Sequence, residues 1–379
     1  MSAATKAPAS GAKNPQLLIR RRADKSDLSL RPPVEIGCFS MDDKRAIFMD
    51  RREARRCVEV PDGGLSSLAW DLNEGSADFQ WRDEDNIKAE GIKPLLEWIM
   101  ANNTVLKEFP DTTFVLKRGV MKDVLTTPYE LEARYPKEWR VKVCRFRNVI
   151  YLCKDVQFPK WDSFSSLSPR DQQTTHWGFR FESYCTAPIT PEAELNSRPN
   201  DTAGFHTVVY TQLAEHCFIL AGEVDGELDR PGQSPPSNSN YVEMKIQREL
   251  AKPQHRETFH RRKLLNAWAQ CYCSGVPNLL IGFRDDDGIV HSVKSYKTAD
   301  LPRMCRDYWS DSGCLNFAKD LFDWLWECIE ETDPLQVQYE VTFQPPFTSI
   351  TLRKVKLDDK SAAVLTPEFV ETKSAAKSE

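Results

Sequence analysis

The chain has 379 residues, 40% of them hydrophobic, with ten Trp, nineteen Phe and ten Tyr, which is the composition of a folded globular protein. Its formal net charge of −5 excludes binding to nucleic acid through an overall positive field, so any such contact has to be local. No segment approaches the roughly 18 consecutive apolar residues that cross a bilayer, and residues 1–16 lack the apolar core of a secretory signal. We therefore expect no membrane partner.

The eleven cysteines are scattered, and most of them fall in apolar segments. They form no C-x-x-C pair, and the six histidines have no zinc-like spacing to them. This pattern predicts buried free thiols in a reducing compartment.

The two ends of the chain differ in composition from its middle. Residues 1–33 are rich in Ala, Lys, Ser and Pro, and residues 357–379 are poor in core residues, so each end is predicted to be a disordered tail. Residues 34–356 show no break in composition and no internal repeat, which predicts a single domain. The basic triplet Arg20-Arg21-Arg22 is a weak signal for nuclear import.

Helical and strand-like periodicity alternate irregularly along the middle of the chain. The expected helices span residues 88–102, 171–185, 257–274 and 315–331. The expected strands span residues 113–116, 139–146, 149–155, 205–212, 216–225, 240–247, 278–285, 289–295, 336–343 and 348–355. Hairpin turns at 147–148 and 285–288, without strict strand–helix–strand alternation, predict the α+β class.

Acidic residues end one expected strand and lie within the next. Glu223 and Asp225 follow the apolar run 218–222, and Glu243 precedes Lys245 by two residues. Side chains two apart share a strand face, so we expect the two strands to pair and to gather three carboxylates and one ammonium group. Such a cluster is costly unless a divalent cation binds in it. With Mg²⁺ or Mn²⁺ it becomes a centre that cleaves phosphodiesters.

The alternative for each pair taken alone is a salt bridge on a solvated strand face, a common use of E-x-D and E-x-K. Two observations favour the metal site. The acids follow a segment apolar enough to be a core strand, and two such pairs occur on consecutive strands.

Three further residues carry groups suited to metal or phosphate. Glu182, on an expected helix, is either a fourth metal ligand or a surface acid. Gln270 lies on one helix face with Lys263, where its amide either orients water or phosphate or is simply solvated. Arg118 is expected where the chain turns after a strand. There its guanidinium suits phosphate, and Gly119 lets the backbone come close to a ligand.

In this order the segments resemble the DXO-type decapping exoribonucleases, a family that includes the partner protein of the large nuclear 5′-to-3′ exoribonuclease. The resemblance runs from residue 35 to about residue 355. Its motifs are Arg118-Gly119 with 125–130 (LTTPYE), 178–182 (GFRFE), 221–225 (AGEVD), 241–245 (YVEMK), 263–265 (KLL) with 268–270 (WAQ), and 275–277 (GVP) with 282–285 (GFRD).

The resemblance implies two packed mixed β-sheets flanked by helices, with a core related to PD-(D/E)XK nucleases. It also implies two Mg²⁺ or Mn²⁺ ions and hydrolysis at the 5′ ends of RNA. The activities of the family are removal of NAD caps and of incomplete caps, release of pyrophosphate from 5′-triphosphate RNA, and 5′-to-3′ degradation, all in RNA quality control. A non-catalytic role, stabilising a larger 5′-to-3′ exoribonuclease partner, is the alternative. We expect a nuclear location, with the cytoplasm as a second location beside it.

The resemblance also implies roles for residues at matching positions. The metal ligands would be Glu182, Glu223, Asp225, Glu243 and the Met244 carbonyl, with Glu223 also counted as catalytic. Lys245 and Gln270 would contact the scissile phosphate and water. The substrate contacts would be Arg118, Lys117, Gly119, Arg45, Glu90 and His206.

The chain departs from the family at two places. Ile246-Gln247 stands where Thr-Ser is frequent, and Lys117 stands where Trp is usual. Both departures leave the carboxylates intact. We expect these two departures to change the cap preference of the protein or the path of the RNA.

Overall fold

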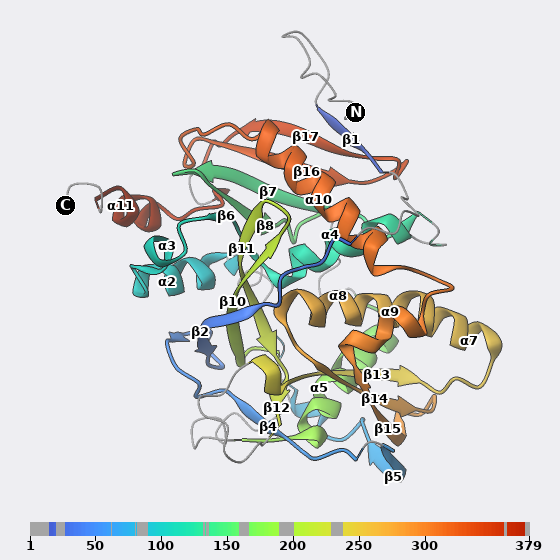
Figure 1. Ribbon diagram of the computed structural model, residues 1–379. Helices are drawn as coiled ribbons and strands as arrows, with labels where there is room; N and C mark the ends of the chain where they lie inside the picture. The colour runs from blue at the N-terminus through green and yellow to red at the C-terminus, as the bar shows by residue number, and fades with distance from the viewer. Residues whose placement is uncertain are drawn as a thin grey trace.

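Two mixed β-sheets, with helices between them and on their outer faces, organise the protein (Figure 1). The computed structural model describes residues 15–19, 27–61, 63–79, 81, 90–131, 133, 136–158, 167–188, 201–228, 238–359 and 362–375. Within these ranges the predicted α+β class, with two packed mixed sheets flanked by helices, is confirmed.

The larger sheet is antiparallel except at its centre, where β6 pairs in parallel with β11 and β8. Within the described residues the strand order is β1 (Gln16–Leu18), β17 (Ser349–Lys356), β16 (Val337–Phe343), β7 (Trp139–Phe146), β8 (Val149–Lys154), β6 (Thr112–Lys117), β11 (His216–Val224), β10 (Gly204–Leu213), β2 (Val34–Met41) and β3 (Ile47–Phe48).

The smaller sheet is also mixed, with β13 parallel to β14 and β12 parallel to β4. Its described strands lie in the order β5 (Leu65–Asp71), β15 (Ile289–Lys297), β14 (Asn278–Arg284), β13 (Tyr241–Arg248), β12 (Gly226–Glu227), β4 (Arg55–Cys57) and β9 (Thr186–Pro188).

Helices fill the space between the sheets and cover their outer faces. The described helices are α2 (Lys93–Ala101), α3 (Val105–Glu108), α4 (Arg118–Glu130), α5 (Pro169–Cys185), α7 (Pro253–Thr258), the π-helix η4 (Phe259–Lys263), α8 (Leu264–Ser274), α9 (Leu301–Met304), α10 (Asp311–Cys328) and α11 (Pro367–Ala375). Short 3₁₀ turns are η1 (Ser76–Asp78), η3 (Asn238–Asn240) and η5 (Thr298–Asp300). None of the helices in the described part combines the length and apolar character needed to span a bilayer.

The alternation of side chains along β11 shows how the layers are built. Phe218 and Leu220 point into a core shared with α4, α8 and α10, whereas Ile219 and Ala221 point to the other face, which α2 and α11 cover. On the far side of the smaller sheet, α5 packs its Trp177 and Phe181. The order of layers is therefore helices, large sheet, central helices, small sheet and α5.

Most expected elements are present with small shifts at their ends. Helix α5 begins at Pro169 because the Ser168 side chain accepts a hydrogen bond from the Asp171 backbone N–H, and Ser310 caps α10 in the same way. The helix expected at 257–274 consists of α7, η4 and α8 in succession. All eleven cysteines are free, and eight of them are buried as predicted, whereas Cys38, Cys153 and Cys328 are half-buried; the reducing compartment stays a prediction.

The expected connection between the two acidic strands is wrong. Strand β11 belongs to the larger sheet and β13 to the smaller one, so they do not pair. The chain crosses from one sheet to the other at Asp225, and β12 immediately pairs antiparallel with β13. Strand β11 is apolar on both faces and packs between two helical layers, whereas β13 packs Val242 and Met244 against α5, so the two strands need different cover. Residues 229–237 lie outside the described residues.

The expected turn at Arg118-Gly119 is also wrong, because helix α4 begins there directly after β6. The two tails expected at 1–33 and 357–379 are corrected in part. Gln16–Leu18 adds β1 to the edge of β17, and α11 buries Phe369 against Tyr151, with ring centroids 5.6 Å apart. A few apolar side chains suffice for such docking without changing overall composition. Residues 1–14, 20–26 and 376–379, with the basic triplet at 20–22, lie outside the described residues.

Candidate active site

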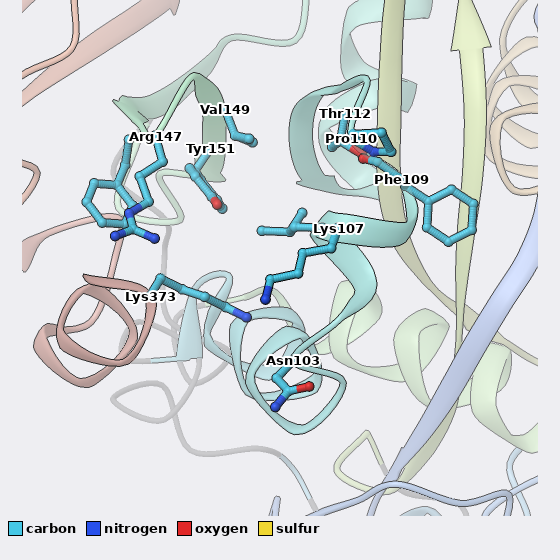
Figure 2. A pocket seen from close by; sticks show the side chains of 11 residues that line it. Asn103, Lys107, Phe109, Pro110, Thr112, Arg147, Val149, Tyr151 and Lys373 are labelled. Atoms are coloured by element: carbon cyan, nitrogen blue, oxygen red, sulfur yellow. The ribbon is translucent and has the colours of Figure 1, made fainter. Parts of the chain in front are cut away.

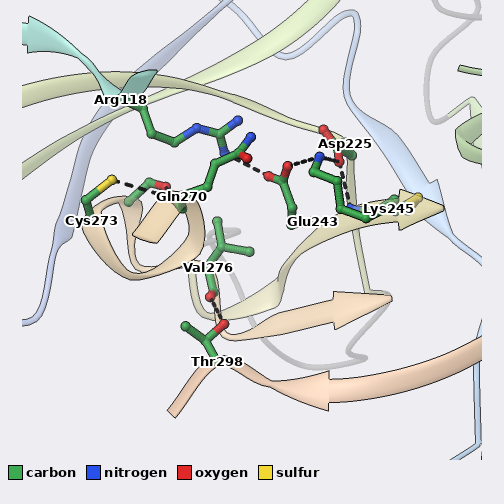
Figure 3. Close-up of polar contacts among 10 residues, drawn as sticks. Arg118, Asp225, Glu243, Lys245, Gln270, Cys273, Val276 and Thr298 are labelled. Atoms are coloured by element: carbon green, nitrogen blue, oxygen red, sulfur yellow. Dashed lines mark hydrogen bonds and ion pairs between the residues drawn. The ribbon is translucent and has the colours of Figure 1, made fainter. Parts of the chain in front are cut away.

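Asp225 and Glu243 meet where the two sheets approach each other (Figure 3). Strand β11 carries Glu223, and Asp225 follows it at the crossing point between sheets. Strand β13 carries Glu243 and Lys245, and α5 brings Glu182 from the outer face of the smaller sheet. Five groups expected from the sequence thus come from two sheets and one helix, although the expected strand pairing does not exist.

Arg118 enters this site from the first turn of α4. Its side chain runs over β11 at Gly222, where an added Cβ would lie 2.8 Å from Arg118 Cδ. The glycine of the AGEVD segment is therefore needed for close approach. Arg118 is 7% exposed, and its Nη1 donates to Glu243 Oε2 at 2.9 Å. Burial with a carboxylate partner makes this pair a fixed part of the site rather than a surface salt bridge.

Glu243 is the most enclosed of the acids, with 1% of its surface exposed. Arg118 binds one of its carboxylate oxygens, and the Lys245 ammonium donates to the other. Burial alone would raise the pKa of Glu243, but Arg118 and Lys245 together hold this pKa below its ordinary value. Glu243 is therefore a carboxylate at neutral pH.

Asp225 and Glu182 have the opposite character. Asp225 Oδ2 accepts the Met244 backbone N–H at 2.7 Å and lies 3.8 Å from Lys245 Nζ. Burial, and then the Glu243 charge, raise the pKa of Asp225 to about 7. Burial, and then Asp225, raise the pKa of Glu182 well above its usual range. Glu182 also senses Glu223, so the four carboxylates share one electrostatic site.

These four carboxylates fit a divalent cation by their chemistry. They are hard oxygen donors in a poorly solvated place, and their mutual repulsion is the kind that a bound Mg²⁺ or Mn²⁺ relieves. No three acidic, His or Cys side chains of the described ranges already enclose a single point as a metal cage would. Instead the Lys245 ammonium group lies within reach of Glu243 and Asp225. The Met244 side chain is buried and its N–H binds Asp225, so a role for its carbonyl stays a prediction.

A second polar cluster adjoins the acids and contains the residues expected to contact substrate. Glu90 binds Arg45 Nε through one oxygen at 2.9 Å and Lys117 Nζ through the other at 2.7 Å. His206 pairs with Glu223 in the β10–β11 register and stacks on Phe39 with ring centroids 4.8 Å apart. Burial, with Arg45 and Lys117 next, lowers the pKa of His206 to about 3, so its ring is neutral. The structure thus brings together four residues that are far apart in the chain.

Gly119 lies beside this cluster. With Glu90, Lys117 and Lys154 it lines a pocket of about 200 Å³. None of the four carboxylates lines this pocket, so a substrate contact by Gly119 stays a prediction.

Gln270 projects from α8 toward the region of Arg118 and Glu243 (Figure 3). Two turns earlier, Lys263 ends the π-helix. Burial, with Lys245 and then Arg284 as neighbouring cations, lowers the pKa of Lys263 to about 8. The pattern of the sequence placed Lys263 and Gln270 on one helix face, but it gave no sign that Lys263 approaches Lys245.

Sequence reasoning missed two other groups around the site. Arg55 on β4 donates to Thr186 Oγ1 at 2.8 Å and senses the Glu182 charge. Arg284 on β14 lies over Trp177, 4.4 Å from the ring centroid. Arg55 sits on a short strand with no motif around it, whereas Arg284 belongs to the 282–285 (GFRD) motif, to which sequence reasoning assigned no role in the site.

An aspartate at the end of one strand, followed on another strand by Glu-x-Lys, is the acid and lysine set of PD-(D/E)XK nucleases. That is the class of protein that this fold and site define. The chain belongs to the family described as RAI1 like PD-(D/E)XK nuclease, whose sequence model matches residues 31–370.

The chain is similar in sequence to named proteins from animals and fungi. It is 32% identical to the decapping and exoribonuclease protein of Bos taurus over 355 residues, which are 90% of this chain and 85% of that protein. It is 29% identical to the decapping nuclease RAI1 of Aspergillus fumigatus over 318 residues, which are 81% of this chain and 85% of that protein.

Solved structures share its fold. Rai1 of Scheffersomyces stipitis, in complex with (3′-NADP)+ and calcium ion, superposes with a TM-score of 0.80 at 23% identity, covering 95% of this chain and all of that one. Rai1 of Candida albicans, in complex with pU5 and Mn²⁺, gives 0.76 at 20% identity and covers 96% of this chain and all of that one.

Proposed function

We propose that this protein is a divalent-metal-dependent hydrolase of RNA 5′ ends. Its reactions would be removal of NAD caps and incomplete guanosine caps, release of pyrophosphate from 5′-triphosphate RNA, and 5′-to-3′ degradation. The observation that carries the proposal is the arrangement around Glu243, which Arg118 and Lys245 bind while Asp225 and Glu182 stay close to protonation beside it. Family membership and the ligands of the similar fungal structures support it.

Glu182, Glu223, Asp225 and Glu243 would hold the cations. Bound there, Mg²⁺ or Mn²⁺ would polarise the scissile phosphate and supply a water nucleophile at neutral pH. For this role Asp225 and Glu182 have to lose their protons, and a cation favours that loss because it replaces carboxylate repulsion by attraction. The Met244 N–H fixes the orientation of Asp225 through its 2.7 Å hydrogen bond.

Two cationic side chains and one amide side chain would contact the phosphate. Lys245 is held between two carboxylates, and it remains protonated because burial is outweighed by Glu243 and Asp225, which raise its pKa. From this place its ammonium can stabilise charge that develops on the phosphate oxygens. Arg118 is held by Glu243 and offers its remaining N–H groups to the substrate. Gln270 can orient water or phosphate without adding charge.

The cluster of Glu90, Arg45, Lys117 and His206 would receive the 5′ end. Glu90 fixes both cations, and neutral His206 adds a flat, uncharged surface. Lys117, which stands where the family usually has Trp, places an ammonium group here instead of an indole. We therefore propose a preference for 5′ ends that carry phosphate over ends read by aromatic stacking.

Two further proposals rest on the family alone. One is association with a large 5′-to-3′ exoribonuclease, and the other is a nuclear location.

Purified protein, NAD-capped RNA and Mg²⁺ or Mn²⁺ test the main proposal. Glu223 is exposed, so Glu223→Ala should fold normally and serve as the inactive control, with Glu368→Ala on α11 as a matched active control. We expect cleavage by the wild-type protein and by Glu368→Ala, and none with EDTA. Cleavage by wild type no greater than by Glu223→Ala would sink the enzymatic proposal and favour a non-catalytic partner role.

The roles of Asp225 and Lys245 can be separated by calorimetric titration with Mn²⁺. Asp225→Ala should weaken metal binding and rate together. Lys245→Ala should lower the rate by roughly a hundredfold, the usual effect of removing one transition-state donor, while metal binding holds or strengthens. If Lys245→Ala loses as much metal affinity as Asp225→Ala, Lys245 is a structural counter-ion and not a catalytic residue.

A further inference from the structure

A second cavity, far from the acids, is lined by cations. It lies between α3, the turn that joins β7 to β8, and the end of α11 (Figure 2). We call it the α11 pocket. Its lining residues are Asn103, Leu106, Lys107, Phe109, Pro110, Thr112, Phe146, Arg147, Val149, Tyr151 and Lys373. These described residues include three cations and no carboxylate.

The three cations line one cavity, and no carboxylate of the described residues lines it with them. The Lys373 ammonium is buried and donates to the Ile99 carbonyl at 3.2 Å. Arg147 Nη2 donates to the Ser374 carbonyl at 3.1 Å, so within the part of the chain that the structure describes the hydrogen bonds of both side chains go to neutral oxygens. In Figure 2 the Lys107 ammonium points toward that of Lys373, and its charge acts on Lys373. Burial, and then the charges of Arg147 and Lys107, lower the pKa of Lys373.

Nearby acids are engaged elsewhere. The Glu331 carboxylate accepts the backbone N–H of Arg147 at 2.9 Å, and Glu108, next to Lys107, contacts Thr104 Oγ1 at 2.5 Å. Like charges held together in a half-enclosed space raise the free energy of the folded state unless an anion binds between them.

The backbone also holds one of these cations in place at a cost. Arg147 has a φ of 52°, in the left-handed region that side chains other than Gly, Asn and Asp seldom adopt. The tight turn keeps this conformation, and with it the guanidinium at the pocket.

The size of the cavity limits the ligand. It measures about 200 Å³, which is below the roughly 300–1,000 Å³ of pockets that enclose drug-sized molecules. Ammonium and guanidinium donors are the groups that bind phosphate, through charge-assisted hydrogen bonds. The pocket lies at Thr112, the first residue of β6, whereas Lys117 at the other end of that strand borders the acids. The two sites are therefore roughly 16 Å apart along the strand, at about 3.3 Å per residue.

We propose that the α11 pocket is a second anion site, which binds the phosphate group of a small phosphorylated molecule between Lys107, Arg147 and Lys373. The phosphate can come as inorganic phosphate or on a nucleoside monophosphate, and the chemistry of recognition is the same. The proposal does not depend on the activity of the acidic site.

Titration of the full chain with inorganic phosphate and, separately, with adenosine monophosphate, followed by ³¹P NMR in EDTA, tests this. EDTA removes any anion binding that depends on metal at the acids. Lys107→Gln and Arg147→Gln should each weaken phosphate binding by about tenfold or more, since each removes a charge-assisted hydrogen bond. Lys356→Gln, on an exposed position of β17, is the matched control and should bind as wild type does. Circular dichroism spectra and melting temperatures verify that the variants fold.

The affinities of the wild-type protein and the variants together show whether the α11 pocket binds phosphate and which ligand carries it. Equal affinities for phosphate and adenosine monophosphate would assign the phosphate group alone as ligand, and a higher affinity for the nucleotide would assign the nucleotide; both support the site. Binding that survives Lys107→Gln and Arg147→Gln, or that disappears in Lys245→Met, would place the anion in the acidic site and overturn the proposal. Absence of saturable binding to the wild-type protein would overturn it as well.

Discussion

Replacing Asp225 with asparagine should stabilise the metal-free protein at neutral and alkaline pH, although it removes a proposed metal ligand. The amide oxygen can still accept the Met244 N–H that Asp225 now accepts at 2.7 Å. What the substitution removes is a buried negative charge next to Glu243 and Glu182. The metal-free site is therefore expected to work against folding.

The magnitude follows from the pKa of Asp225, which burial and Glu243 raise from 3.8 to about 7. Between these two values the folded state binds more protons than the unfolded state, so the free energy of unfolding falls as pH rises through the window. Each pH unit corresponds to about 1.4 kcal/mol, so the penalty reaches roughly 4 kcal/mol above pH 7 and only about a third of that at pH 5.

Urea denaturation of wild type and Asp225→Asn, in EDTA between pH 5 and pH 8, measures this penalty. The advantage of the variant should grow by about 2–3 kcal/mol from pH 5 to pH 7.5. Asp50→Asn is the control, because Arg52 outweighs partial burial and lowers the pKa of Asp50, so this carboxylate stabilises the folded state. Its replacement should lower the free energy of unfolding, whereas Asp225→Asn should raise it. The effect of Asp50→Asn should stay constant above pH 5.

Added Mg²⁺ provides the complementary test. It should raise the stability of the wild-type protein at pH 8 and leave Asp225→Asn nearly unchanged, since a ligand stabilises only the state that binds it. A stability difference between wild type and variant that is flat with pH would refute the reasoning. It would show that solvent or local rearrangement screens Asp225 in the folded protein.

Three other changes test the packing of the site. Arg118→Met leaves Glu243 buried without its main partner and should cost about 3–5 kcal/mol in urea denaturation; the double variant with Glu243→Gln should recover much of it. Gly282→Ala would place a Cβ 2.4 Å from Phe181 Cε2, so helix α5 has to shift; we expect about 1–3 kcal/mol lower stability and weaker Mn²⁺ binding through displaced Glu182, and unchanged metal affinity would contradict this. The His206 ring, with a pKa of about 3, should show no chemical-shift change by NMR between pH 5 and pH 8; a midpoint near 6.5 would contradict its burial.

The strands and the long helices were predictable because their signals are local. The apolar run within 216–224 and the alternation along 241–248 reflect which faces of each strand are buried, and neither signal depends on which strands lie beside them. The nature of the site was predictable for the same reason. Carboxylates two residues apart, next to a core strand, are unusual enough to indicate metal chemistry.

The partners of these strands could not be read from the chain. Both acidic strands look alike, so a hairpin was expected, whereas β11 and β13 lie in different sheets and Asp225 marks the crossing. Helix α4 was missed because it follows strand β6 directly, with no polar turn segment between them to mark its start. It is stabilised by packing against α8 and α10, which are remote in sequence. The C-terminal helix α11 carries few apolar residues, so its sequence gives little sign of a helix. It is held in place because Phe369 packs into the core cluster that contains Tyr151.

The sequence by itself thus determined which groups are available: four carboxylates, Lys245, Arg118 and Gln270. Only the tertiary structure decided their state. It buries Arg118 on Glu243, raises the pKa of Asp225 through its neighbours, and binds Glu90 to Arg45 and Lys117 across the chain. Charge, protonation and pairing depend on distances between residues remote in sequence and on the water excluded around them, and a local pattern contains neither.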